Sequence, residues 1–462
     1  MAAPVLSAVK RIVLALIAFA AASLALAAPA SAQSLIRDAE IEDTLRVYAT
    51  PLLQAAGLDP DDVTLYIVND SSLNAFVAGG QNIFVHTGLI LAADTPNELI
   101  GVLAHETAHI SGGHLVRQRE AIAQSMRTGL ISIGLGVLAM AAGAPDAGAA
   151  IIASSQQFAM GNMVRHTRVQ ESAADQAAVQ YLEATGQSPR GLLDFFNKNI
   201  RPYEFMVRRA PPYLVTHPFS SDRVEALRPR IDNSPSLNAT DSEDYLRRFR
   251  FMQAKLVGFL MSQGQTLARY PLSDTSQPAR YARAVAYFRG SDLEQSRREL
   301  QSLISEDPRN PYYQELMGQI LFENGRAAES IPFHRRSIEL DPGQPLLEVN
   351  LARALISANG RAGADEALPI LQDVINAEPD NAYAWRELAQ ARELRGERAL
   401  AELSSAELNF WMRNYPAAVS FAERARRSLP QGTPSYQRAV DIANFAGAEV
   451  REREQQRGSR RG

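Results

Sequence analysis

The chain has 462 residues, and none of them is cysteine. This absence excludes a disulfide framework, a cysteine nucleophile, thiolate metal ligands and a lipidated N-terminal cysteine. Any metal site must therefore be built from histidine and carboxylate side chains. Histidine is itself scarce, with seven residues in the whole chain, so chance seldom places two of them at a metal-binding spacing.

The chain also lacks a large excess of charge of one sign. Its 47 Lys and Arg residues face 51 Asp and Glu residues, which leaves a formal net charge of −4. Without a broad positive field to neutralise phosphates, we expect no nucleic-acid partner. The hydrophobic content of 46% and the charged content of 21% are ordinary for a globular protein, and the length suits two or three domains.

The N-terminus has the pattern of an export signal. Lys10 and Arg11 precede an apolar run over residues 12–28, and Ala30-Ser31-Ala32 is the small-x-small pattern that a signal peptidase requires. We therefore expect cleavage after Ala32 and a mature protein in the periplasm. The alternative is an uncleaved membrane anchor, for which this run lies near the lower length limit.

Hydrophobic periodicity predicts the elements of the first half of the mature chain. The spacing over residues 34–57 predicts a helix, and a polar cap followed by proline at 94–98 predicts the start of another. The β-branched runs 63–68 and 82–87, with 74–78 and a Gly-Gly turn between them, predict a small antiparallel sheet with a hairpin.

Two apolar limbs, residues 130–142 and 149–153, flank a turn that contains Gly and Pro. Each limb is too short to cross a bilayer core of about 30 Å. The segment 121–165 is therefore either a hydrophobic helical hairpin near the functional site or the membrane surface, or a pair of core helices. The first alternative would give the protein a peripheral membrane contact.

The second half of the chain contains a repeat. Pro308, Pro342 and Pro379 each follow an acidic residue, at spacings of 34 and 37 residues, and Leu, Ala and Gly recur at matching positions between them. A period of 34 is typical of tetratricopeptide repeats, in which each unit is a pair of helices. We expect a capping helix near 435–450 and a charged, disordered tail over 451–462.

The residues that carry chemistry are His105-Glu106-Thr107-Ala108-His109. Histidines at positions i and i+4 share one helix face, with Cβ atoms about 5–6 Å apart, so both imidazoles can reach one Zn²⁺. Glu106 flanks the same cavity and can take a proton from a water that the metal activates.

A third ligand must come from elsewhere in the chain. Glu171 and Asp175 share a helix face, so one carboxylate can bind the metal while the other accepts a hydrogen bond from the outer N–H of a ligating histidine. The alternative is a solvated acidic helix face, which the nearby histidine motif disfavours. His114 lies five residues after His109, a spacing that makes a shared metal awkward and favours a place at the surface or behind the ligands.

Together these patterns match a zinc metallopeptidase with two histidine ligands and one glutamate ligand. The chain resembles metallopeptidase family forty-eight, and within it the exported branch that carries a C-terminal tetratricopeptide domain. The resemblance covers nearly the whole mature chain. It is carried by His105-Glu106-Thr107-Ala108-His109, Glu171 with Asp175, Asn74-Ala75-Phe76-Val77 with Gly79-Gly80, and Thr216-His217-Pro218 with Arg223.

The resemblance implies roles for these residues. His105, His109 and Glu171 would bind one zinc ion per chain, and Glu106 would be the catalytic base. The segment 74–77 would border the substrate cleft as an edge strand, which an extended substrate joins by main-chain hydrogen bonds.

Three further residues complete the expected site. His217 would either approach the metal in a self-inhibited state or stabilise the oxyanion in a working one. Arg223 would either assist oxyanion binding or pair with local carboxylates. Asp175 is expected among the catalytic residues, as the carboxylate that orients a ligating histidine.

The resemblance further implies a periplasmic endopeptidase whose protein clients are outer-membrane β-barrel proteins or their assembly machinery. One alternative is a periplasmic chaperone or adaptor that works through the repeat domain, with proteolysis secondary. Another is a membrane-anchored housekeeping protease.

The expected fold class is α+β: a mostly helical zincin-type metalloprotease domain with a small β-sheet, followed by an all-α tetratricopeptide-repeat solenoid. The expected boundaries are a signal peptide at 1–32, the metalloprotease domain at 33–240, a connecting helix and linker at 241–270, the repeat domain at 271–450 and the tail at 451–462.

Overall fold

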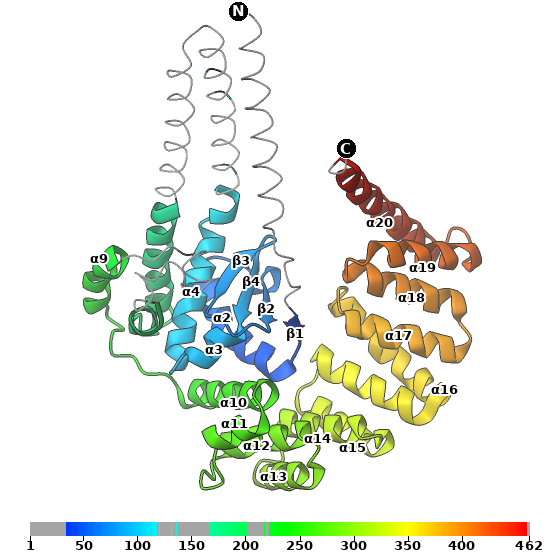
Figure 1. Ribbon diagram of the computed structural model, residues 1–462, viewed down its shortest axis with the longest axis horizontal. Helices are drawn as coiled ribbons and strands as arrows, with labels where there is room; N and C mark the ends of the chain where they lie inside the picture. Colours follow the sequence, from blue (N-terminus) through cyan, green and yellow to red (C-terminus); the bar gives the residue numbers. More distant parts are fainter. Residues whose placement is uncertain are drawn as a thin grey trace, which may run out of the picture.

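The computed structural model describes residues 34–117, 167–200 and 221–459, together with the single residues Glu120, Ile131, Leu135 and His217 (Figure 1). The expected signal peptide at 1–32 lies outside the described residues, and so does the apolar segment 121–165 apart from Ile131 and Leu135. Among the described residues, no helix combines the length and the apolar character that crossing a bilayer requires.

The first part of the chain combines helices with one small sheet. Its elements are β1 (Leu35–Ile36), α2 (Ala39–Ala55), the 3₁₀ turn η1 (Pro60–Asp62), β2 (Thr64–Val68), β3 (Ala75–Ala78), β4 (Asn82–His86), α3 (Thr87–Ala92), α4 (Pro96–Ser111), α7 (Arg190–Phe195), the π-helical turn η2 (Phe196–Ile200) and α9 (Ser221–Asp232). Residues 167–184 are also helical.

The four strands form one mixed sheet in the order β1-β2-β4-β3. β3 and β4 pair as the antiparallel hairpin that the Gly-Gly turn predicts, with Phe76 opposite Phe84. β2 and β4 pair in parallel, with Tyr66 opposite Phe84, so the expectation of an antiparallel sheet is wrong for this pair. The chain passes from β2 to the far edge of the sheet before it returns through β4, and β4 therefore runs in the direction of β2.

The first helix begins later than its apolar spacing predicts. Residues 35–36 form β1, which pairs antiparallel with β2, and α2 starts at Ala39. Asp38 caps α2 by accepting a hydrogen bond from the backbone N–H of Ile41, as a residue just before a helix commonly does. The helix predicted over 34–57 is therefore correct for 39–55 and wrong for its first residues.

Helix α4 is fixed along almost its whole length. Thr95 caps the helix by accepting a hydrogen bond from the N–H of Glu98, and Pro96 occupies the first turn. This start confirms the helix predicted from 94–98. Every residue from Glu98 to Ala108 is buried, so side chains on this stretch are held by contacts on all sides.

The described remainder of the chain consists of helices and their connections. The helices are α10 (Glu243–Leu260), α11 (Gln263–Arg269), α12 (Gln277–Arg289), α13 (Leu293–Glu306), α14 (Pro311–Glu323), α15 (Ala327–Leu340), α16 (Pro345–Ala377), α17 (Ala382–Arg395), α18 (Arg398–Trp411), α19 (Tyr415–Ser428) and α20 (Pro434–Ser459).

These helices pack against their neighbours in sequence and form an arc beside the first part (Figure 1). α13, α15 and α16 each end one residue before the acidic residue of an acid–proline pair, which confirms the predicted helical repeat. α16 contains two helices that meet at Gly360, whose φ of 55° lies in the left-handed region that favours glycine. α20 extends to Ser459, so the expected disorder of the tail is wrong for residues 451–459.

Helix α10 contributes to the cores of both parts. Phe249, Met252 and Leu256 pack in the core that surrounds the sheet, whereas Phe251 packs among helices α12 to α14. The expected connecting segment 241–270 is thus mostly helical, in α10 and α11. The domain boundaries themselves remain predictions.

A buried charge cluster joins the start of α2 to the repeat helices. Lys255 of α10 is 2% exposed, and its ammonium lies 2.8 Å from Asp38 and 3.3 Å from Glu40. Tyr281 of α12 donates a hydrogen bond to Glu40, and Glu315 of α14 lies 3.9 Å from the same ammonium. Burial raises the pKa of Glu315 to about 7; Lys255 opposes this shift, and the carboxylates of Asp38 and Glu40 add to it.

We predict that Glu315→Gln removes a pH-dependent loss of stability. Folded Glu315 keeps its proton up to about pH 7, whereas the unfolded chain releases it near the ordinary value of 4.5. The folded state therefore binds more protons within this window, and its stability falls as the pH rises, by up to about 3 kcal/mol. Thermal unfolding of both proteins across the window measures the difference.

The variant should be stabilised relative to the wild type above about pH 7 and not near pH 4.5. Glu294→Gln, at an exposed position on the neighbouring helix α13, is the matched control and should leave the pH dependence unchanged. Equal pH dependence in Glu315→Gln and the wild type would contradict the prediction.

Candidate metal centre

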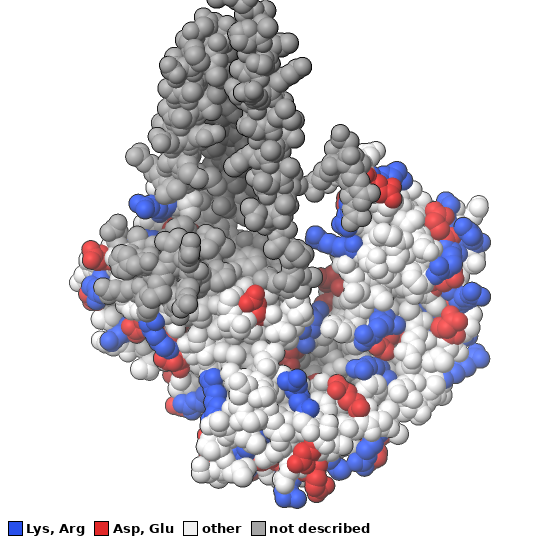
Figure 2. Space-filling model, viewed as in Figure 1, with Lys and Arg blue, Asp and Glu red and all other residues white. Residues whose placement is uncertain are grey.

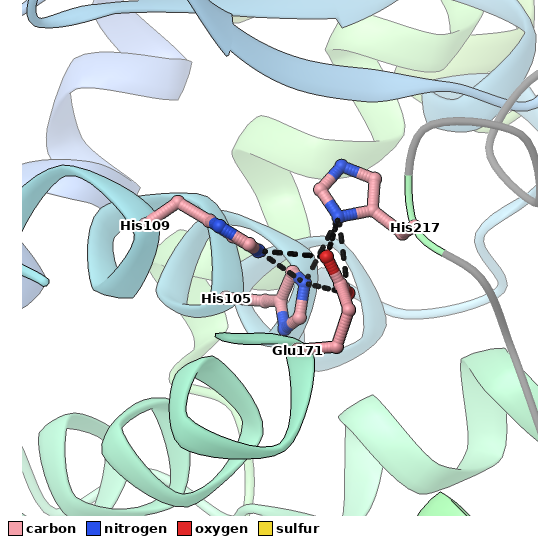
Figure 3. A group of neighbouring side chains, drawn as sticks. All are labelled: His105, His109, Glu171 and His217. Carbon is pink, nitrogen blue, oxygen red and sulfur yellow. Dashed lines mark hydrogen bonds and ion pairs between the residues drawn. The ribbon is translucent and has the colours of Figure 1, made fainter. Parts of the chain in front are cut away.

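Helix α4 directs His105 and His109 toward one point. Their Nε2 atoms lie 3.1 Å apart, as the i, i+4 spacing on one helix face allows (Figure 3). His105 is completely buried, and the side chain of His109 is 12% exposed. The two imidazoles therefore present adjacent nitrogen atoms in a site largely closed to water.

Glu171 reaches the same point from the helical residues 167–184. Its Oε2 lies 3.3 Å from Nε2 of His105, and its Oε1 lies 3.5 Å from Nε2 of His109. The residue is 2% exposed. The structure thus brings together the three side chains that the sequence predicts as metal ligands.

His217 joins this cluster from a bend outside the helices (Figure 3). Its Nδ1 lies 3.3 Å from Nε2 of His105 and 3.2 Å from Oε1 of Glu171. Its Nε2 lies 3.4 Å from Oε1 of Glu106. One ligand atom from each of His105, His109, Glu171 and His217 lies within 4.8 Å of all the others.

The separations of these atoms suit a single cation. A tetrahedral ion with ligands at about 2.0–2.1 Å holds its ligand atoms roughly 3.3 Å apart. The ligand atom of His105 lies 3.1 to 3.3 Å from those of His109, Glu171 and His217. Oxygen atoms of Glu171 lie 3.5 Å from His109 and 3.2 Å from His217. Two imidazoles of one helix and one carboxylate are also a donor set that zinc prefers.

The electrostatics of the cluster point the same way. Burial opposes protonation of His105, yet Asp175 and Glu171 together raise the pKa of His105 to about 10. Burial and the neighbouring imidazoles of His105 and His217 hold the pKa of His109 well below its usual value, so His109 keeps a free lone pair. Carboxylates that favour an added proton on an imidazole also favour a metal cation that replaces this proton.

Each histidine of α4 has a partner behind it. Oδ1 of Asp175 lies 3.0 Å from Nδ1 of His105, an arrangement that directs the Nε2 lone pair into the cluster. Nδ1 of His114 lies 3.0 Å from Nδ1 of His109. His114 is buried, and it contacts the outer nitrogen of His109.

The place of His114 depends on two glycines that follow α4. Gly112 ends the helix, and Gly113 has a φ of 61°, a left-handed conformation that turns the chain. A Cβ atom on Gly112 would lie 2.6 Å from Nε2 of His114, so the ring occupies space that only glycine leaves. Spacing alone left His114 either at the surface or behind the ligands, and the Gly-Gly pair is the sequence signal that favours the second place.

Arg223 of α9 holds both carboxylates of the site. Its Nε and Nη2 each donate a hydrogen bond of 2.7 Å to Asp175, and its Nη1 lies 3.0 Å from Oε2 of Glu171. Of the two roles weighed for Arg223, these contacts support pairing with local carboxylates. The guanidinium also lies 5.7 Å from the ring centre of Phe196, which meets His105 edge-on and was not predicted as part of the site.

Glu106 is the buried carboxylate beside the cluster. It is completely buried, and within the described part of the chain neither of its oxygens accepts a hydrogen bond. Burial raises the pKa of Glu106 above its usual 4.5, and the charges of His217 and His105 only partly offset this. A carboxylate with a raised pKa is suited to accept a proton during a reaction near neutral pH.

Strand β3, at the edge of the sheet, lies beside helix α4. β3 is the end strand of the sheet and packs against α4. The segment 74–77 therefore overlaps the edge strand that packs against the helix of His105 and His109, and an extended chain could add to the sheet at this edge.

Comparison with known proteins agrees with this geometry. Residues 36–231 match the family described as Peptidase family M48. The chain is 28% identical to the beta-barrel assembly-enhancing protease of Yersinia pestis, over 72% of this chain and 68% of that protein. It is 25% identical to the putative beta-barrel assembly-enhancing protease of Vibrio cholerae, over 87% and 83%. It is 28% identical to the metalloprotease LoiP of Escherichia coli, over 37% and 63%.

We predict that Asp175→Asn weakens divalent-metal affinity by about 10–100-fold. The amide lacks the negative charge that favours a proton on Nδ1 of His105, and it leaves Arg223 with one carboxylate fewer. Competition with a chromophoric chelator measures the affinity. Asp194→Asn, an exposed position on α7, is the control and should bind metal as the wild type does. Unchanged affinity in Asp175→Asn would refute the role of this carboxylate.

Proposed function

We propose that this chain, whose residues 36–231 belong to peptidase family M48, is a periplasmic zinc endopeptidase that acts on outer-membrane β-barrel proteins during their assembly or quality control. The observation that carries the enzymatic part is the convergence of His105, His109 and Glu171 beside the buried carboxylate of Glu106. No other described cluster offers a metal such a set of ligand atoms.

The proposed chemistry is hydrolysis of a peptide bond. When bound by His105, His109 and Glu171, a zinc ion supplies an electrophile that activates a water molecule and polarises the scissile carbonyl. Glu106 accepts the proton of the attacking water on its carboxylate and passes it to the nitrogen of the leaving amine. Asp175 keeps the ring of His105 in the orientation that ligation requires.

We propose that His217 closes the site at rest. Its Nδ1 lies as close to His105 and Glu171 as the other ligand atoms do, and its Nε2 faces Glu106. An attacking water must lie beside Glu106, so the ring occupies the space that the water needs. The competing role, stabilisation of the oxyanion, requires the ring to turn from the cluster toward the substrate.

The client class rests on the names of the relatives and on the export pattern. The two alignments with beta-barrel assembly-enhancing proteases extend over 72% and 87% of the chain. On the face shown in Figure 2, side chains of both charges are interspersed over the repeat helices with uncharged areas between them. We propose that the domain at 33–240 cuts the client and that the repeat domain at 271–450 binds the client or its assembly machinery.

We predict that Glu106→Gln retains one zinc per chain and lowers kcat on an unfolded protein substrate by about 10²–10⁴-fold. The amide preserves the size of the side chain and removes the group that accepts the proton. Metal analysis and a proteolysis assay on the same preparation separate the two effects. Full proteolysis by the zinc-loaded variant would refute the assignment of the base. An unaltered cellular phenotype despite lost proteolysis would favour the adaptor alternative.

We predict that His217→Ala raises the rate of proteolysis several-fold at unchanged zinc content. Removal of the ring clears the space beside Glu106 that the attacking water needs. Initial rates on the same unfolded substrate, with zinc measured in parallel, provide the test. A fall in kcat at unchanged zinc content would instead support the oxyanion role.

A further inference from the structure

Three aromatic rings form a stack across the sheet. Tyr66 of β2 and Phe84 of β4 have ring centres 4.9 Å apart and planes inclined by 17°. Phe84 and Phe76 of β3 have ring centres 5.0 Å apart and planes inclined by 10°. The three residues are direct cross-strand partners, so the rings repeat at the spacing of the strands themselves.

The stack lies on the face of the sheet opposite the core. Along β2 and β4 the intervening side chains Leu65, Ile67, Ile83 and Val85 are buried in the core, whereas the three stacked residues are each partly exposed. Successive side chains of a strand point to opposite faces, which explains why the rings share the outer one. Phe76 also meets the ring of His86 edge-on at 5.9 Å, which helps to fix its orientation.

The stack ends at the edge strand beside α4. Among the described residues, β3 pairs with β4 only, so Phe76 is the last ring before the edge. A fifth strand added there would lie about 4.8 Å beyond β3. Its residue opposite Phe76 would point to the same outer face, at the distance that separates the existing rings.

We propose that Phe76 selects client segments that carry an aromatic side chain at the position paired with it, so that the client ring becomes the fourth ring of the stack. The proposal rests on the proposed function, because the added strand is a segment of the protein client. Phe84 is a positioning residue: it does not contact the client, and it holds the ring of Phe76 parallel to the next strand. The matching client is an extended segment with aromatic residues at alternate positions, as transmembrane β-strands carry near the membrane interfaces.

The chemistry of the stack explains why an aromatic ring would be preferred to an aliphatic side chain. Pairs of aromatic rings gain energy beyond the area that they bury, which corresponds to about a three- to tenfold difference in affinity for one pair. The main-chain hydrogen bonds of an added strand are the same for every sequence and confer no such preference. Selection therefore depends on the ring of Phe76 and on its alignment by Phe84.

Binding by a protein without the catalytic base tests the proposal. In the Glu106→Gln background, fluorescence anisotropy gives the Kd of two labelled ten-residue peptides, one of alternating Phe and Thr and one of alternating Val and Thr. Alternation over the whole peptide places a Phe or a Val opposite Phe76 at every second register, so shifts by two residues are equivalent. We expect the Phe peptide to bind about three- to tenfold more tightly.

Phe76→Thr should bring the ratio of the two affinities close to one, and Phe84→Thr should reduce it. Phe76→Tyr keeps a ring at this position and should keep the ratio, which guards against a fold that is merely disturbed. Phe445→Thr removes a half-exposed ring from α20, far along the chain, and is the matched control. A ratio that Phe76→Thr leaves unchanged, or that Phe445→Thr abolishes equally, overturns the proposal.

The readout separates this proposal from the proposed function. Peptide binding to the Glu106→Gln protein is measured without any need for hydrolysis, so a preference for the Phe peptide supports docking whether or not the wild type is a protease. Absence of proteolysis by the zinc-loaded wild type would refute the enzymatic function alone. Absence of a preference for the Phe peptide, in a wild type that does cut protein, would refute the selection by Phe76 alone.

Discussion

Lone pairs that face one another inside a protein repel unless a positive charge lies among them, and this constraint governs the whole first part of the molecule. The nitrogen and oxygen atoms of His105, His109 and Glu171 lie 3.1 to 3.5 Å apart in a site almost closed to water. Such a group is stable when a metal cation lies within it or when His105 carries an extra proton, which the neighbouring carboxylates favour. The burial of α4 on all sides keeps the two histidines from turning away, and Arg223 prevents the two carboxylates from separating.

The site is assembled from segments that differ in how strongly they are held. The two histidines and Glu106 belong to a single rigid helix, and Glu171 and Asp175 lie one turn apart on another. His217 lies in a bend outside both helices, and it is the cluster member with the fewest constraints from its own secondary structure. A side chain in such a place can leave the cluster without disturbing the rest, which is what a resting state that opens for substrate needs.

Features that depend on neighbours in sequence could be predicted, and those that depend on distant pairing could not. The spacing of His105 and His109, the shared face of Glu171 and Asp175, and the acid–proline ends of the repeat helices are all local. The parallel pairing of β2 with β4 is decided by where the chain crosses the sheet, and no pattern within either strand records that crossing. Spacing left His114 either at the surface or behind the ligands, and the turn at Gly113 decides for the place behind His109. The tail at 451–459 is polar, yet it continues a helix that begins at Pro434 in the packed array.

Lys255, which lies between the sheet-containing part and the repeat helices, has a consequence for any study that divides the protein. Lys255 belongs to α10, which leads into the repeats, while its partners Asp38 and Glu40 stand at the start of α2. A fragment of α10 and the repeats would contain the ammonium group of Lys255 without these two carboxylates. A protease fragment that ends before α10 would contain the two carboxylates without the ammonium group. Loss of function after such a cut would therefore report damaged folding as well as a missing partner surface, because the two parts share charges and core residues through α10.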